Sequence, residues 1–328
     1  MPTYIILQNP GHNRVYFKAA RDLALLELEL ASKKMSTALS NLKEEIIGGV
    51  HYILFDTKSS ITESDILLLS RLSFVYGIFE GKDNMLYPLE KNPNYFFEND
   101  DITTILKYNG KTNELFTRMM INVAAFYCSF DGQLNILDPL CGKGTTLFEG
   151  LLNGHNVSGI ETDEKQVHEA YIFLKKYLEN ARYKHANHQE RQGMDGYSAK
   201  RYQLNLPDAK VEFLSGDTRH TGLFYRKNSF HIIVGDLPYG VQHSSKKSSE
   251  KSRNALPLIE EAAAGWHKVL KPGGTIALAW NLFLIERKEM EEVLVVNGFK
   301  LAMPAGDESF VHRVDQAILR DLIVGVKT

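Results

Sequence analysis

The stretch Asp138-Pro139-Leu140-Cys141-Gly142-Lys143-Gly144-Thr145-Thr146 lies between an apolar run at 134–137 and a helical pattern at 145–152. It therefore predicts a turn that joins a buried strand to a helix. Gly142 and Gly144 allow such a turn to adopt unusual dihedral angles and to approach a ligand closely. Because the first turn of the following helix has unpaired backbone N–H groups, the stretch is a candidate cofactor site.

Two common phosphate-binding motifs do not fit this turn. A P-loop needs Ser or Thr after its lysine, whereas Lys143 is followed by Gly144, and the dinucleotide fingerprint needs a glycine where Leu147 stands. The acidic Asp138 at the entry of the turn also disfavours a bound pyrophosphate. A carboxylate in this position suits a cationic amino group and indicates a nucleotide-like cofactor that carries one.

Around this turn, short apolar runs alternate with helical patterns. Strands are expected at 134–138, 156–160, 211–214, 230–235 and 274–280, and helices at Thr145–Leu152, Glu164–Ala181 and Leu256–Leu270. This alternation predicts an α/β fold in which helices cover both faces of a parallel sheet. Sheets of this kind bind ligands beyond the carboxyl ends of their strands.

Polar residues follow two further strands of the expected sheet. Glu161, in Gly159-Ile160-Glu161-Thr162-Asp163, comes after Gly144 at close to the ~20-residue spacing of a ribose-binding acid in nucleotide folds. The stretch Ser215-Gly216-Asp217-Thr218 ends another strand, where an acidic side chain can contact an adenine amine. Three polar strand ends together with a glycine turn predict a nucleotide-like ligand.

A second motif, Asp236-Leu237-Pro238-Tyr239-Gly240, follows the apolar run Phe230-His231-Ile232-Ile233-Val234. The run predicts a buried strand that ends at an exposed edge of the sheet. At that edge, a carboxylate can accept the hydrogens of a planar amine and an aromatic ring can stack on its plane. Pro238 stiffens the turn between them.

These motifs resemble those of the S-adenosylmethionine-dependent class I methyltransferases. The Asp-Leu-Pro-Tyr-Gly form is similar to that of the THUMP-associated tRNA guanine-N2 methyltransferases, and Leu237 departs from the broader Asn/Asp-Pro-Pro-Tyr/Phe pattern. The segment 107–115 also resembles the one before the first motif of that family. The resemblance covers roughly 105–325 and is fainter over 1–100, where Ser70–Ile78 looks like the end of an N-terminal module.

The resemblance implies a Rossmann-like domain, with a mostly parallel seven-stranded sheet that ends in an antiparallel hairpin. It also implies S-adenosyl-L-methionine as cofactor and Asp236, Pro238 and Tyr239 as catalytic residues. The residues expected to bind the cofactor are Lys111, Thr112, Asn113, Asp138, Pro139, Cys141, Gly142, Gly144, Thr145, Thr146, Glu161, Thr162, Asp163, Gly216, Asp217, Thr218 and Asp236.

The chain of 328 residues is long enough for two domains. Residues 1–100 are expected to form a smaller α+β domain, with strands at 4–7 and 50–55 and a helix at 17–30. The resemblance suggests a ferredoxin-like or THUMP-related module there, with a role in RNA binding. Residues 101–328 are expected to form the methyltransferase domain.

A nucleic-acid site would have to be a local basic patch, because the net charge is only -2. Four cations after the second motif, Lys246, Lys247, Lys251 and Arg253, are expected to contact phosphates of an RNA substrate, for which tRNA is the leading choice. A further basic stretch at 182–191 interrupts the run between two expected strands.

Other site classes find little support in the sequence. Cys128 and Cys141 make no disulfide framework, and His185 and His188 lack a third metal ligand, so no metal site is expected. A reducing, cytoplasmic location is expected from the cysteine usage. No apolar run approaches the ~20 residues of a membrane helix.

The leading interpretation is an RNA methyltransferase that acts on the N2 amine of a guanosine in tRNA. A DNA or rRNA amino-methyltransferase, acting on adenine N6 or guanine N2, is the nearest alternative. A non-catalytic RNA-binding protein that retains the cofactor fold is another alternative. A nicotinamide dehydrogenase is the third, and the missing dinucleotide fingerprint weakens it.

Overall fold

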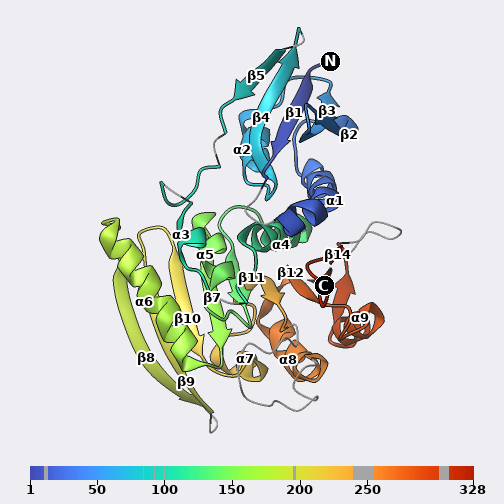
Figure 1. Ribbon diagram of the computed structural model, residues 1–328. Helices are drawn as coiled ribbons and strands as arrows, with labels where there is room; N and C mark the ends of the chain where they lie inside the picture. The colour runs from blue at the N-terminus through green and yellow to red at the C-terminus, as the bar shows by residue number, and fades with distance from the viewer. Residues whose placement is uncertain are drawn as a thin grey trace. The chain divides into compact units, whose positions relative to one another are not determined.

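The structure is a computed structural model that describes residues 1–10, 14–83, 85–91, 93–98, 100–108, 110–194, 197–238, 255–302 and 310–328 (Figure 1). The chain divides into two compact units. The first comprises Met1–Asn94 with His312–Asp315, and the second comprises Tyr95–Val311 with Gln316–Thr328.

The first unit is built on an antiparallel sheet with the strand order β2-β3-β1-β4-β5. Its elements are β1 (Thr3–Gln8), α1 (Arg14–Ser32), β2 (Leu39–Ile47), β3 (Val50–Thr57), α2 (Glu63–Ser70), β4 (Val75–Lys82), β5 (Met85–Leu89) and the short β14 (His312–Arg313). From β1 to β4 they follow the β-α-β-β-α-β succession of a ferredoxin-like motif.

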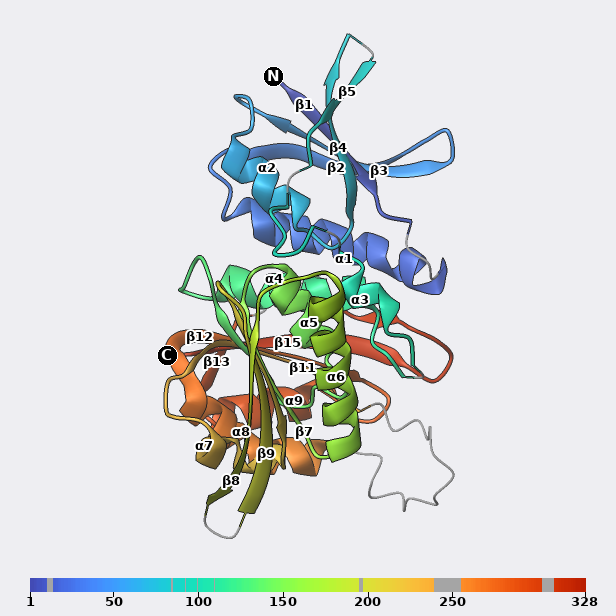
Figure 2. The same cartoon turned by 90° about the vertical axis from the view of Figure 1, so that its left-hand side faces the viewer.

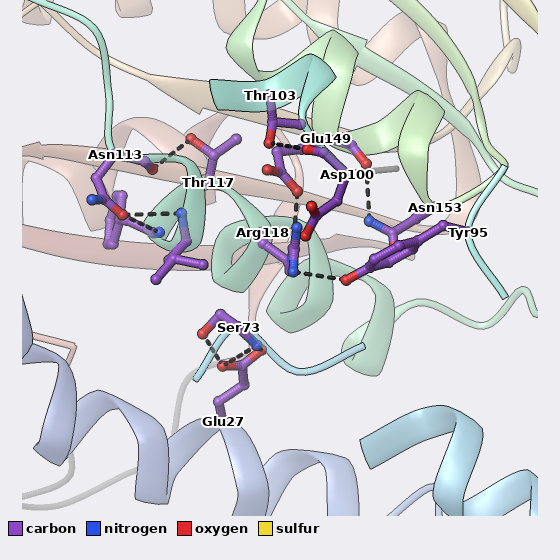
Figure 3. Close-up of polar contacts among 12 residues, drawn as sticks. Glu27, Ser73, Tyr95, Asp100, Thr103, Asn113, Thr117, Arg118, Glu149 and Asn153 are labelled. Atoms are coloured by element: carbon purple, nitrogen blue, oxygen red, sulfur yellow. Dashed lines mark hydrogen bonds and ion pairs between the residues drawn. The ribbon is translucent and has the colours of Figure 1, made fainter. Parts of the chain in front are cut away.

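Buried polar contacts fix the helices of this unit. Thr62 and Asp65 form a capping box that starts α2, since each side chain accepts the backbone N–H of the other residue. The carboxylate of Glu27 in α1 is fully buried and accepts the backbone N–H and the hydroxyl of Ser73, as Figure 3 shows. These bonds satisfy polar groups that burial would otherwise penalise.

The second unit alternates strands and helices, as the sequence predicts. Its elements are α3 (Ile102–Ile105), α4 (Glu114–Tyr127), β6 (Asn135–Asp138), α5 (Thr145–Leu152), β7 (Asn156–Glu161), α6 (Glu164–Asn180), β8 (Ala186–Met194), β9 (Tyr197–Asn205), β10 (Lys210–Ser215), a 3₁₀ turn (Thr218–His220), α7 (Thr221–Phe224), β11 (Phe230–Asp236), α8 (Leu256–Val269), β12 (Leu270–Asn281), α9 (Arg287–Val296), β13 (Phe299–Leu301) and β15 (Leu319–Lys327).

The sheet of this unit has the order β13-β15-β12-β11-β6-β7-β10-β9-β8. The strands β10, β7, β6, β11 and β12 are parallel, and β15 pairs antiparallel with both β12 and β13. The mostly parallel sheet with an antiparallel end is thus confirmed. Helices α4, α5 and α6 pack on one face, and α7, α8 and α9 pack on the other (Figures 1 and 2).

The hairpin of β8 and β9 adds two strands beyond the seven that were expected. β9 pairs antiparallel with β10, and β8 pairs with β9. Its buried side chains Tyr202 and Leu204 alternate with polar ones, and the Tyr202 ring lies 5.0 Å from that of Tyr171 in α6. The basic stretch at 182–191 therefore leads into β8, which is the edge strand. The alternation in β9 gives the hairpin one buried face.

The stretch Lys271-Pro272-Gly273-Gly274 lies inside β12. Pairing between β11 and β12 changes register between Phe230 and Ile232, and Gly273 has a φ of +77° there.

In the described residues, no helix is both long and apolar enough to span a bilayer.

Candidate active site

Acidic residues end neighbouring strands at one edge of the large sheet. Asp138, Glu161 and Asp236 are the last residues of β6, β7 and β11, which lie in the order β7-β6-β11. In register, Asp138 lies opposite Gly159 of β7. Because these strands are parallel, their carboxyl ends meet at the same edge, so the structure brings the predicted strand-end acids together.

The glycine turn between β6 and α5 takes the conformation that its sequence predicts. Gly142 and Gly144 have φ values of +51° and +89°, which residues with a side chain rarely adopt. A Cβ on Gly144 would lie 3.2 Å from the Phe213 ring, so a larger residue would also be crowded. The backbone N–H of Cys141 donates to the carbonyl of Ile160 at 2.9 Å and holds the turn beside β7.

Glu161 connects this turn with the end of β7. Its carboxylate accepts the backbone N–H of Gly142 at 3.2 Å, the N–H of Asp163 at 2.9 Å and the hydroxyl of Thr162 at 3.1 Å. Asp163 itself caps α6 by accepting the N–H of Lys165. The side chain of Glu161 is thus fixed beside the glycine turn.

Asp138 is a buried carboxyl group at the centre of this edge. It accepts the backbone N–H of Leu140 at 2.9 Å and a bond from the Thr146 hydroxyl. Burial raises the pKa of Asp138 to about 7, and the nearby charges of Asp236 and Glu161 act in the same direction. The carboxyl group can therefore change charge near neutral pH.

Asp236 lies at the end of β11, and its side chain is 10% exposed. The hydroxyl of Thr112 donates to its Oδ2 at 2.6 Å, and the guanidinium of Arg320 lies 3.9 Å from the same oxygen. Burial raises the pKa of Asp236, whereas Arg320 and Thr112 lower it. This carboxylate can accept hydrogen bonds from an amine, because its oxygens are acceptors when it is ionised.

Tyr108 belongs to the same group of side chains, although it was not among the predicted site residues. Its hydroxyl lies 3.0 Å from that of Thr145, and the ammonium of Lys143 lies over its ring at 5.3 Å from the centroid. Burial raises the pKa of Tyr108, and the charges of Asp138 and Asp236 add to this. Its place within the segment 107–115, which resembles the family, was the sequence signal that could have identified it.

A buried ion pair fixes the two helices that start at this edge. Arg118 of α4 donates to Glu149 of α5 at 3.0 Å and to the hydroxyl of Tyr95 at 2.8 Å (Figure 3). Asn113 caps α4 by accepting the N–H groups of Leu115 and Phe116. Helix α4, which Thr112 precedes, is therefore held against α5, whose N-cap residue is Gly144.

The side chains of several predicted cofactor residues serve local structure. Lys111 donates to the carbonyl of Thr103 and pairs with Glu114 at 3.5 Å. Thr218 accepts the indole N–H of Trp266 at 3.0 Å in the core. Both side chains therefore have partners within the protein in this structure.

Asp217 is engaged by a neighbouring cation. Both carboxylate oxygens accept from Nε of Arg219, at 3.0 and 2.9 Å, and the pKa of Asp217 is lowered mainly by this contact. Next to it, the N–H of Gly216 donates to the carbonyl of Glu161 at 3.0 Å. The two strand ends are thus joined through their backbones.

The remaining predicted residues are placed as follows. Pro139 packs near Gly235 of β11, Leu237 is buried and Pro238 is exposed. Tyr239, Lys246, Lys247, Lys251 and Arg253 lie outside the described residues. Across the part of the chain that the structure describes, no group of three or more His, Cys, Asp or Glu side chains could hold a metal ion.

Comparison with known proteins supports a common origin for this arrangement. The model of the UPF0020 family, described as RMKL-like methyltransferase domain, matches residues 107–307. No curated protein sequence matches the chain.

Two solved structures are similar to the chain at low sequence identity. TrmN from Thermus thermophilus matches with a TM-score of 0.50 and 13% identity over 100% of both chains. A TehB-like SAM-dependent methyltransferase from Corynebacterium glutamicum matches with a TM-score of 0.36 and 16% identity, over 61% of this chain and 83% of that one. The likeness to TrmN shows the fold, a Rossmann-like class I methyltransferase sheet with an additional N-terminal antiparallel sheet.

Proposed function

The chain belongs to the UPF0020 family of RMKL-like methyltransferase domains, and from that premise we propose that it methylates the exocyclic N2 amine of a guanosine in tRNA. The observation that carries this proposal is the largely buried side chain of Asp236 at the end of β11, beside the glycine turn and followed by Leu237 and Pro238. The Asp-Leu-Pro-Tyr-Gly sequence supports guanine as the base, because it resembles that of the tRNA guanine-N2 enzymes.

S-adenosyl-L-methionine is the cofactor, and the residues present fit it. Gly142 and Gly144 have positive φ values, and neither carries a side chain at the edge where a ligand would lie. We assign the Asp138 carboxylate to the cationic amino group, the Glu161 carboxylate to the ribose hydroxyls and the Gly216–Asp217 segment to the adenine. When bound, the cofactor supplies a methyl group on a sulfonium, whose sulfur keeps the bonding electrons as the methyl group leaves.

Replacement of Glu161 by Ala is expected to weaken cofactor binding by about 1–3 kcal/mol, because two hydroxyl groups would lose a charged acceptor. Calorimetry with S-adenosylhomocysteine measures this directly. Glu169→Ala is a matched control, since Glu169 pairs with Lys143 at 2.7 Å but lies on α6. Unchanged affinity in the Glu161 variant would remove this residue from the cofactor site.

Asp236 is the proposed acceptor for the target amine. An exocyclic amine is a poor nucleophile, because its lone pair is delocalised into the ring. When Asp236 and a neighbouring backbone carbonyl accept hydrogen bonds from the two N–H groups of the amine, its nitrogen can direct its lone pair at the methyl carbon. Positioning and fixed dipoles then account for most of the rate enhancement.

Pro238 and Tyr239 complete the proposed catalytic group. The ring of Tyr239 would stack on the target base, and the base must leave its own stack to reach it. Tyr239→Phe should therefore retain activity, whereas Tyr239→Ala should lose it.

The direct test is methyl transfer from tritiated S-adenosylmethionine to bulk tRNA from cells that lack the protein. Mass analysis of the nucleosides is expected to show N2-methylguanosine. A product methylated on carbon or on ribose would contradict the amine assignment, and a product methylated on the N6 amine of adenine would contradict the choice of guanine. Transfer to DNA alone would favour the alternative amino-methyltransferase, and cofactor binding without transfer to either would favour a non-catalytic RNA-binding protein.

Neutralisation of Lys246, Lys247, Lys251 and Arg253 is expected to flatten the salt dependence of tRNA binding, by a slope of roughly one unit for each lost phosphate contact. Filter binding at several salt concentrations measures the slope. A variant that neutralises Lys288 and Lys300, two exposed cations of α9 and β13, serves as control. An equal slope in both variants would show that the four residues are solvated rather than bound to RNA.

A further inference from the structure

Arg320 is a buried cation at the catalytic edge. It belongs to β15, where it lies opposite Asn281 of β12, and it is only 4% exposed. Its guanidinium carbon lies 4.2 Å from the centre of the Phe116 ring in α4, and its Nη2 lies 3.9 Å from Oδ2 of Asp236. Packing over the ring therefore holds the charge beside the carboxylate.

The position of Asp236 creates a need for such a charge. An ionised carboxylate taken out of water is costly unless a cation or hydrogen bonds compensate it. The proposed reaction needs the ionised form, because only that form offers acceptors alone to an amine. We propose that Arg320 is a positioning residue that keeps the Asp236 carboxylate charged and oriented for the amine, an inference that rests on the function proposed above.

The groups facing Asp236 make the contribution of Arg320 decisive. Thr112, before α4, donates to its Oδ2 but carries no charge. Asp138, from β6, is a second carboxyl group whose charge acts on the same edge, and Tyr108 lies near both acids. Arg320 is the cation of this group that acts on Asp236, and its charge opposes the effect of burial on the pKa of that carboxyl group.

The rate of methyl transfer as a function of pH separates this role from a structural one. With saturating cofactor and tRNA, activity should fall as pH drops and Asp236 gains a proton. In Arg320→Met, which keeps the volume but loses the charge, the midpoint of this fall is expected about 1–2 pH units higher. In Arg320→Lys, which restores the charge, the midpoint should return most of the way to that of the native protein.

A neighbouring ion pair provides the matched control. Arg287 of α9 donates to Asp321, the residue after Arg320 in β15, at 2.6 Å. Arg287→Met removes a buried charge contact from the same strand without touching Asp236, so its midpoint should not move. An Arg320→Met enzyme with a lower rate at every pH but the native midpoint would overturn the proposal and leave only a packing role.

A second measurement does not depend on the substrate. Carbon-13 NMR of labelled Asp side chains, with the Asp236 signal identified by its loss in Asp236→Asn, should give a higher pKa for Asp236 in Arg320→Met. Arg320→Gln carries the same expectation should the Met variant fail to fold. Inactivity of the native enzyme on tRNA would refute the proposed function, whereas an unmoved Asp236 titration would refute the role of Arg320 alone.

Discussion

Replacement of Asp236 by Asn is expected to lower methyl transfer by roughly 10²-fold or more, while the affinity for S-adenosylhomocysteine changes little. Asn keeps the shape of the side chain, but it loses the charge and presents an N–H donor where the amine needs an acceptor. The measurement is tritiated methyl transfer to tRNA at saturating substrate, together with calorimetry of the cofactor product.

The control for this variant is Asp208→Asn, which removes an exposed carboxylate outside the proposed site. It should transfer methyl groups at the native rate. Near-native transfer by the Asp236→Asn enzyme would refute the proposed mechanism, even if the protein proved to methylate tRNA.

Replacement of Asp138 by Asn is expected to weaken cofactor binding by about 10–100-fold at pH 8, because the amino group would lose a charge-assisted hydrogen bond. In the native protein, burial raises the pKa of Asp138 to about 7. Cofactor affinity should therefore rise as pH increases through 7, and this rise should be absent from the variant. Calorimetry with S-adenosylhomocysteine between about pH 6 and 8 tests both statements.

The stability of the cofactor-free protein should change in the opposite direction. Because the pKa of Asp138 is higher in the folded than in the unfolded chain, the folded state binds more protons between about pH 4 and 7. The free energy of unfolding contributed by this group is therefore present below about pH 4 and is lost as pH rises through 7. Asp138→Asn should accordingly melt higher than the native protein at pH 8, with a smaller difference at pH 5; identical melting at both would contradict the raised pKa.

Local patterns in the sequence were sufficient for most of the large sheet. The helix expected at Thr145–Leu152 has those bounds as α5, because an apolar run after a glycine turn leaves few alternatives. The strand-end acids were also predictable, since parallel strands place their carboxyl ends together. The β8–β9 hairpin was not, because its buried face consists of a few side chains between polar ones.

The rest of the site depends on contacts between distant segments. Thr112 meets Asp236 across 124 positions of the chain, and Arg320 meets it from the last strand. A charged pair, Arg320 and Asp321, inside an otherwise apolar strand was a visible signal, but no local rule says which residues such charges will face. The contact between Asp217 and Arg219 is a local one, since the two residues are two positions apart in the chain.

The β8–β9 hairpin changes which strand forms the outer edge of the large sheet. Without the hairpin, β10 would be the edge strand, and fraying of that strand would directly disturb residues 215–217 at its carboxyl end. With it, the outermost strand is β8, whose described side chains are exposed from Ala186 to Arg191. Polar and charged side chains on an edge strand discourage pairing with other chains. Transient opening of β8 can thus occur two strands away from the residues assigned to the adenine without displacing them.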